Sequence, residues 1–232
     1  MIRKHSEKLE QVRGRIDTAC REAGRRPESV QLLAVSKTHP ASAVSHLHQL
    51  GQRAFGESYV DEAVAKITEL AELDIEWHYI GPIQSNKTRT IAEHFDWVQG
   101  VDRSKIVRRL ADQRPGRHAP LNILIQVNID DEPQKAGCHP DDIAGLAAMI
   151  AEHDTLRLRG LMAIPAPRED FADQKTVFDR LFALYRELQA THPQVDTLSA
   201  GMSADLEAAI AAGSTMVRVG TALFGTRVKW KT

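Results

Sequence analysis

The sequence predicts an α/β protein, a (β/α)8 TIM-type barrel with an additional N-terminal helix. Eight short apolar runs alternate with amphipathic stretches along the 232 residues. Strands that alternate with helices imply right-handed crossovers and a parallel sheet. About eight such units in roughly 230 residues suit a compact barrel. An open doubly wound sheet is the second choice, because no glycine-rich fingerprint follows the first apolar run, LLAVS.

The additional helix is predicted from a stripe of apolar residues near the N-terminus. Leu9, Val12, Ile16, Ala19 and Ala23 recur at helical spacing, and a glycine at position 24 with a proline at position 27 ends the pattern. A cysteine beside the stripe, at position 20, is interpreted as part of the core.

The strands and helices of the barrel follow from the length and periodicity of each segment. The last helix is predicted to begin at Ser203, as its N-cap, and to stop at Gly213. The expected strands are 32–36, 54–56, 78–80, 97–101, 123–129, 158–164, 197–200 and 216–220. The expected helices are 40–50, 59–73, 103–113, 141–152, 171–190 and 203–212.

The composition of the chain excludes several classes of function. The net charge is -1 and charged residues make up 26%, so no basic field supports binding to nucleic acid. The N-terminus has no apolar signal segment, and no apolar run approaches the roughly 20 residues of a membrane span. The two cysteines lie far apart in sequence. We therefore expect a reduced, cytoplasmic protein whose residues 1–232 form a single domain.

The first chemical signal is Lys37, which ends the stretch LLAVSK. Side chains of a strand alternate between faces, so Leu33, Val35 and Lys37 point the same way. In a barrel, Lys37 would project into the C-terminal mouth, where chemistry occurs in this fold. Apolar walls disfavour the charged form of an amine and favour Schiff-base formation. A strand-ending lysine that reaches solvent is an equally good interpretation of this pattern alone.

The second signal is at the end of the chain. Ser203 lies between the strand and the helix of LSAGMSADLE, and Gly220 and Thr221 follow the apolar run MVRV. Loops after the last two barrel strands often bind phosphate. Arg218 alternates with Met216 and so faces the interior, where a guanidinium needs a partner. A lysine, a phosphate site and an inward arginine together describe a site for pyridoxal phosphate.

These motifs resemble the pyridoxal phosphate homeostasis protein family, the single-domain relatives of the alanine racemase N-terminal barrel. The resemblance runs from near residue 6 to about residue 227. It rests on five stretches of sequence, which are LLAVSKT, WHYIGPIQSNKTRTI, VNIDDEPQKAG, LRGLMAIP and LSAGMSADLEAAIAAGSTMVRVGTALFG.

The resemblance implies a role for each matching residue. Lys37 would carry the cofactor as an internal aldimine, and Arg218 would face the pyridine nitrogen. Ser199 would orient Arg218. The implied cofactor-binding set is Lys37, Ser58, Ser199, Met202, Ser203, Arg218, Gly220 and Thr221, and the phosphate would lie on Ser203, Gly220 and Thr221. One departure is Ser58, because the family usually has FGEN where this chain has FGES.

Three functions compete. A carrier would hold pyridoxal phosphate reversibly and buffer or deliver it within vitamin B6 homeostasis, with apo-enzymes as possible recipients. An arginine at the ring nitrogen donates a hydrogen bond rather than accepting one, so carbanion chemistry is limited. A low-activity racemase or lyase ranks second, because the chain offers no second domain and none of Tyr59, Tyr79 and Tyr185 stands out as the opposing base. A cofactor-free Schiff-base aldolase ranks third.

Some features remain open or are interpreted as structural. Lys135 is a weak candidate for a secondary amine on the mouth side of the barrel. His78 is interpreted as a hydrogen-bonded core residue, and no histidine spacing matches a zinc site. The sequence leaves both a monomer and a weak dimer open.

Overall fold

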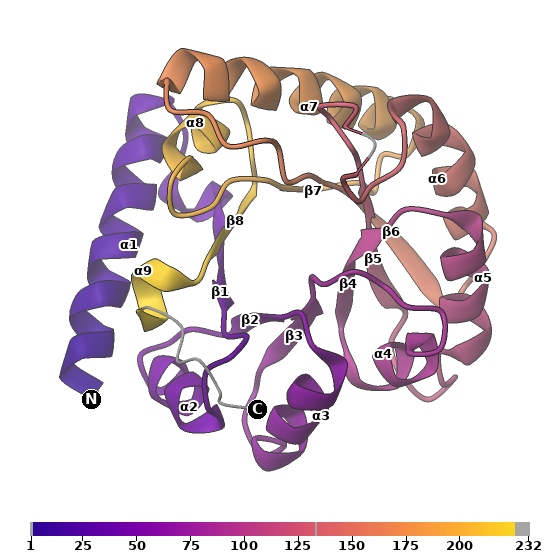
Figure 1. Cartoon of the computed structure of the whole chain (residues 1–232), viewed down its shortest axis with the longest axis horizontal. Coiled ribbons are helices and arrows are strands. Elements are labelled where there is room, and N and C mark those ends of the chain that lie inside the picture. The colour runs from indigo at the N-terminus through magenta and orange to yellow at the C-terminus, as the bar shows by residue number, and fades with distance from the viewer. Residues whose placement is uncertain (1, 133, 226–232) are drawn as a thin grey trace.

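The barrel expected from the sequence is confirmed. The computed structural model describes residues 2–132 and 134–225, in which the strands close into a parallel barrel in the order β1 to β8 (Figure 1). Each strand pairs with the next one in sequence, and β8 pairs with β1. Closure excludes the open sheet. The single domain expected over residues 1–232 includes residues 1, 133 and 226–232, which lie outside the described residues.

The strands are short and their C-terminal ends meet at one mouth, as parallel pairing requires. They are β1 Gln31–Val35, β2 Ala54–Glu57, β3 Glu76–Tyr79, β4 Trp97–Val101, β5 Leu121–Gln126, β6 Leu156–Met162, β7 Thr197–Ser199 and β8 Met216–Val219.

Helices cover the outside of the barrel (Figure 1). They are α1 Ile2–Glu22, α2 Ala41–Gln49, α3 Val60–Glu69, α4 Thr88–His94, α5 Ser104–Gln113, α6 Ile143–Ala151, α7 Phe171–Thr191, α8 Leu206–Ala211 and α9 Thr221–Phe224, with 3-10 turns η1 Pro27–Ser29 and η2 Pro140–Asp142. No helix within the described ranges is long and apolar enough to cross a membrane.

The predicted N-terminal helix is α1, and its apolar stripe packs on the barrel layer. Leu9, Val12, Ile16 and Ala19 are all at most 4% exposed, and Cys20 is fully buried among them. The helix lies beside α8 and α9 (Figure 1), so it reaches the part of the barrel formed by the last strands.

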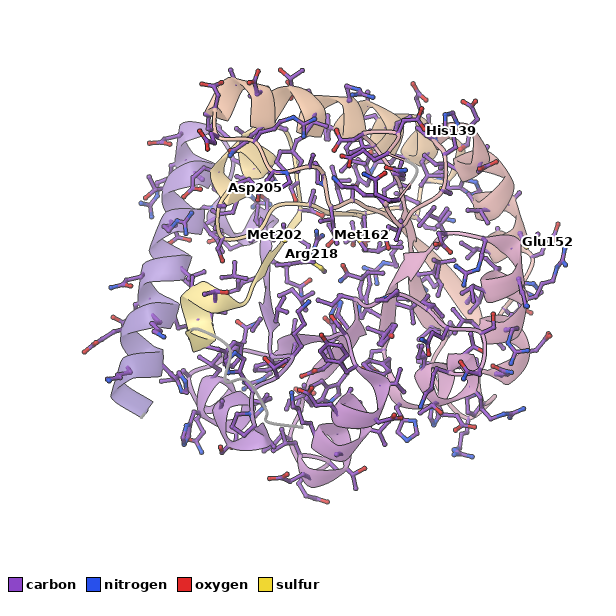
Figure 2. All side chains as sticks on the ribbon, in the orientation of Figure 1. His139, Glu152, Met162, Met202, Asp205 and Arg218 are labelled. Carbon is purple, nitrogen blue, oxygen red and sulfur yellow. The ribbon has the colours of Figure 1, made fainter. Side chains whose placement is uncertain are left out.

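Alternation along the strands separates an inner from an outer face. Leu33, Ala54 and Met216 form an apolar cluster with Ile80 inside the barrel, apart from the large cluster between strands and helices. Arg218 is two residues beyond Met216 on β8 and shares its inward direction (Figure 2). The inner face thus supplies a polar side chain just below the mouth.

One predicted boundary that matters for the site is wrong. Ser203 is not the N-cap of the last helix, because α8 begins at Leu206 after a turn over residues 203–205. The Asp205 carboxylate accepts a hydrogen bond from the Met202 N–H at 2.6 Å, which stabilises this turn ahead of the helix. Gly213 ends the helix as predicted, with φ of 110°.

Candidate functional site

Lys37 lies two residues beyond the end of β1, in a turn, and its side chain is half-buried. It lines an open cavity of about 560 Å³ at the mouth of the barrel. Residues at the end of β3 and after β2, β3 and β6 complete the lining, among them Ser58, Tyr59, Tyr79, Ile80, Lys87 and Ile164. A lysine in this position can meet a small molecule that enters from solvent.

A buried ionic network lies on the outer side of the same turn, and the sequence interpretation missed it. The Nζ atom of Lys66 on α3 lies 2.8 Å from a carboxylate oxygen of Glu57 and 2.6 Å from one of Glu62. Glu57 is fully buried and also accepts a hydrogen bond from Ser36 Oγ at 2.6 Å. Burial raises the pKa of Glu57, and the Lys66 ammonium opposes that rise. A carboxylate inside an apolar strand, as in AFGE, is the signal that could have revealed it.

The network holds the residues on both sides of Lys37. Lys66 Nζ donates to the Ser36 carbonyl at 2.8 Å, and the Thr38 N–H donates to Glu62 at 2.7 Å. Thr38 has φ of 67°, a left-handed conformation that is unfavourable for a β-branched residue. The surrounding contacts stabilise this strained turn and so fix the direction of Lys37.

Arg218 is 4% exposed inside the barrel. Its Nη1 atom donates to the carbonyl and to the hydroxyl of Ser199, each at 2.7 Å, and Nη2 donates to the Ala163 carbonyl at 2.9 Å. Among the described residues no carboxylate lies within ion-pair distance of Arg218, and its Nε–H and second Nη2–H donate to no described residue. Burial lowers the pKa of Arg218 to about 10, so the guanidinium stays charged near neutral pH.

The loop after β7 carries Met202 and Ser203 and contacts β8, where the Arg218 N–H donates to the Gly201 carbonyl at 2.9 Å. Figure 2 shows Met202 beside Arg218. The Met202 N–H is engaged by Asp205, whereas its side chain is 38% exposed. The Ser203 hydroxyl has no acceptor or donor among the described residues. Arg15 of α1 donates to the Ser203 carbonyl at 2.9 Å and forms two hydrogen bonds with Glu207. The N-terminal helix therefore holds this loop in place.

The loop after β8 completes the candidate phosphate site with Gly220 and Thr221. Gly220 packs against the end of β1, since a Cβ there would lie 3.3 Å from the Val35 carbonyl oxygen. Thr221 begins α9 and is exposed. The fold thus brings the loop after β8 against the end of β1, two residues before Lys37.

Two other candidates come from other parts of the chain. Ser58 follows β2 and lines the cavity of Lys37, and the described lining of that cavity includes no residue of the loops after β7 and β8. Lys135 is engaged in ion pairs, at 2.9 Å from Glu132 and 3.7 Å from Asp130. Among the described residues, no cluster of side chains suits a metal ion.

The chain was compared with known families and structures. Residues 8–228 match the family model of the alanine racemase N-terminal domain. The pyridoxal phosphate homeostasis protein of Escherichia coli K12 is 54% identical over 222 residues, which cover 94% of this chain and 95% of the relative. The chain belongs to the pyridoxal phosphate homeostasis protein family.

A further relative and a solved structure are similar to this chain over nearly its whole length. The pyridoxal phosphate homeostasis protein of Pseudomonas aeruginosa is 54% identical, with 96% of this chain and 95% of the relative covered. The structure of PipY from Synechococcus elongatus, solved with PLP bound, has a TM-score of 0.82 and 38% identity. It covers 95% of this chain and all of that one. The predicted family and fold are confirmed over nearly the whole chain.

Proposed function

We propose that this protein binds pyridoxal phosphate reversibly and takes part in vitamin B6 homeostasis by buffering or delivering it. Lys37 forms the Schiff base with the cofactor aldehyde. The backbone and hydroxyl groups of Ser203, Gly220 and Thr221 hold the phosphate. The names of the family members and the PLP bound to PipY support this choice of ligand.

The observation that carries the proposal is an open donor inside the barrel, the Nε–H of Arg218, from which no described residue accepts a hydrogen bond. A buried guanidinium is costly unless its donors are paired. The contacts to Ser199 and Ala163 leave the Nε–H without an acceptor in the described part of the chain. The unprotonated nitrogen of a pyridine ring is a neutral acceptor of the required kind, so the donor set fits pyridoxal phosphate.

The same arginine argues against robust catalysis. A guanidinium has no acceptor atoms, so Arg218 donates to the ring nitrogen and cannot stabilise it in a protonated form. When bound, pyridoxal phosphate supplies an electron sink for carbanions, and that sink is weak without a pyridinium. The residues around Arg218 therefore favour retention of the cofactor over turnover.

A low-activity racemase or lyase is the second candidate, favoured by one observation. Tyr59 is 53% exposed and lines the cavity of Lys37, where a phenol could exchange a proton with a ligand. Tyr79 is less suited, because burial raises its pKa to about 12 and its hydroxyl donates to Pro82 at 3.0 Å. Turnover of an amino acid that disappears in Tyr59→Phe would establish this alternative.

Titration of the purified protein with pyridoxal phosphate, followed by absorption, tests the proposal. A visible imine band is expected for the native protein, and it should be lost in Lys37→Ala. Lys87→Ala is the matched control, since Lys87 is a second lysine of the same cavity, and its amine pairs with Asp61 at 2.7 Å. Its band should persist. A band that survives in Lys37→Ala would assign the aldehyde to another amine and refute the role of Lys37.

A further inference from the structure

A chain of hydrogen bonds crosses the barrel interior and ends at Arg218. Glu76 lies 2.8 Å from His78 Nε2, and His78 Nδ1 lies 2.9 Å from Gln99 Nε2. Ser199 Oγ lies 2.7 Å from Gln99 Oε1 and 2.7 Å from Arg218 Nη1. The residues of this hydrogen-bond chain come from four strands, β3, β4, β7 and β8. The first two strands are far in sequence from the last two, so only the folded barrel brings the residues together.

The chemistry of the groups gives the chain a single direction. Arg218 can only donate, so Ser199 Oγ accepts from it and must give its own proton to Gln99 Oε1. The orientation of the Gln99 amide is set independently, because its Nε2 also lies 3.2 Å from the Met216 sulfur, which is only an acceptor. His78 Nδ1 then accepts from Gln99.

The last link fixes the protonation of the histidine. With Nδ1 as acceptor, His78 carries its proton on Nε2 and donates it to Glu76. Burial lowers the pKa of His78, in agreement with a neutral ring. The ring also stacks on Trp97, with centroids 5.0 Å apart and planes 12° apart, so it has little freedom to turn. Every link from Arg218 to Glu76 therefore runs from donor to acceptor.

The chain is also shielded from water over most of its length. His78, Gln99 and Ser199 are fully buried, whereas the Glu76 side chain is 38% exposed. A hydrogen bond in such an environment is stronger than in water, and links in one direction polarise one another. Removing a central member leaves buried groups unpaired on both sides.

We propose that Gln99 and His78 are positioning residues for the cofactor. They act through Ser199 and keep the Arg218 guanidinium oriented toward the ring nitrogen. Both Nη1 hydrogens are committed to Ser199 and one Nη2 hydrogen to the Ala163 carbonyl, so the direction of the Nε–H depends on the position of Ser199. The proposal rests on the proposed function, since it assumes the ring lies against Arg218. Neither residue touches the ligand in this account.

The test combines two measurements on Gln99→Leu and on a matched control, Gln52→Leu. Gln52 is also a buried glutamine, at 5% exposure, but its amide donates to the Leu32 and Ala54 carbonyls near the N-terminal ends of β1 and β2. We expect Gln99→Leu to bind pyridoxal phosphate roughly tenfold more weakly than Gln52→Leu. The absorption maximum of the bound cofactor should shift in Gln99→Leu and stay unchanged in Gln52→Leu. Ser199→Ala should give the same shift, and the double variant should be no worse than either single one.

A third, independent measurement is nitrogen-15 NMR of the histidine rings in the native, cofactor-free protein. His78 should be the neutral Nε2–H tautomer, a result that does not depend on cofactor binding or on the folding of any variant. An Nδ1–H tautomer, or equal spectra and affinities for Gln99→Leu and Gln52→Leu, would overturn the inference. Failure of the native protein to bind pyridoxal phosphate would instead refute the proposed function, while the tautomer still decides the direction of the chain.

Discussion

The Nζ atom of Lys66 donates a hydrogen bond to the carbonyl oxygen of Ser36 at 2.8 Å. A buried lysine on α3 thereby holds the residue that directly precedes Lys37. The same ammonium pairs with Glu57 and Glu62, so the charge of Lys66 is satisfied without any ligand. The two lysines have separate roles in this account, because Lys66 fixes the turn and Lys37 presents its amine to the cavity.

Lys66→Met should destabilise the fold and reduce covalent loading of pyridoxal phosphate. Removing one partner of a buried ion pair costs about 3–5 kcal/mol, because the carboxylate of Glu57 is left uncompensated. Urea denaturation of the cofactor-free protein measures the free energy of unfolding. Lys87→Met is the control, since its pair with Asp61 is largely exposed and such pairs contribute about 0–1 kcal/mol. Equal losses in the two variants would contradict the role given to Lys66.

Arg15→Ala should weaken binding of pyridoxal phosphate more than binding of pyridoxal. Arg15 holds the Ser203 carbonyl and Glu207, so its loss frees the loop that we assign to the phosphate. A several-fold weaker affinity for the phosphorylated form is expected by isothermal titration calorimetry. Arg21→Ala on the same helix is the control, because the Arg21 side chain is 70% exposed and lies 4.0 Å from Asp17. An equal loss for both ligands would place the phosphate elsewhere.

Acid should release the same link between α1 and the loop after β7. Although burial acts in the opposite direction, the hydrogen bond from Arg15 lowers the pKa of Glu207 below its usual value of 4.5. A depressed carboxyl pKa contributes stability that is present above the usual value and is lost as pH falls through the folded value. Carbon-13 NMR should show that Glu207 titrates below pH 4.5 in the native protein. In Arg15→Ala its titration should move closer to pH 4.5. An unchanged titration in the variant would rule out this coupling.

Gly160→Ala should disrupt the strands that support Arg218. Gly160 has φ of 149°, and a Cβ there would overlap the carbonyl oxygen of Thr197 on the neighbouring strand. The substitution forces β6 and β7 apart and displaces Ala163 and Ser199, the two residues that hold the guanidinium. We expect a loss of at least about 2 kcal/mol in unfolding free energy together with weaker cofactor binding.

Gly145→Ala is the matched control for that substitution. Gly145 lies on α6 with open space around its Cβ position, so alanine should stabilise the helix by about 0.5–1 kcal/mol. Destabilisation by Gly145→Ala, or tolerance of Gly160→Ala, would show that the strand packing described for β6 and β7 is wrong.

The fold was predictable because each strand and helix of the barrel leaves a local pattern. The run LLAVS predicts strand 32–36, and β1 is Gln31–Val35. The prediction that the last helix starts at Ser203 was wrong because of a local hydrogen bond. Serine, aspartate and glutamate in SADLE are typical of a helix start, but the Asp205 carboxylate bonds to the Met202 N–H and delays α8.

The support of the site was less predictable, because it depends on residues far apart in sequence. Lys37 and Arg218 could be proposed from their places after and within apolar runs. Ser199 and Gln99 are separated by 100 residues, and nothing in either segment predicts their 2.7 Å hydrogen bond. Only the closure of the barrel brings such pairs together.

The most direct test of the central claim is reduction of the protein with borohydride after addition of pyridoxal phosphate, followed by peptide mapping. We predict a single major adduct on the peptide that contains Lys37, at about one equivalent per chain. No adduct, or an adduct spread over surface lysines in proportion to their exposure, would contradict a dedicated cofactor site at the end of β1.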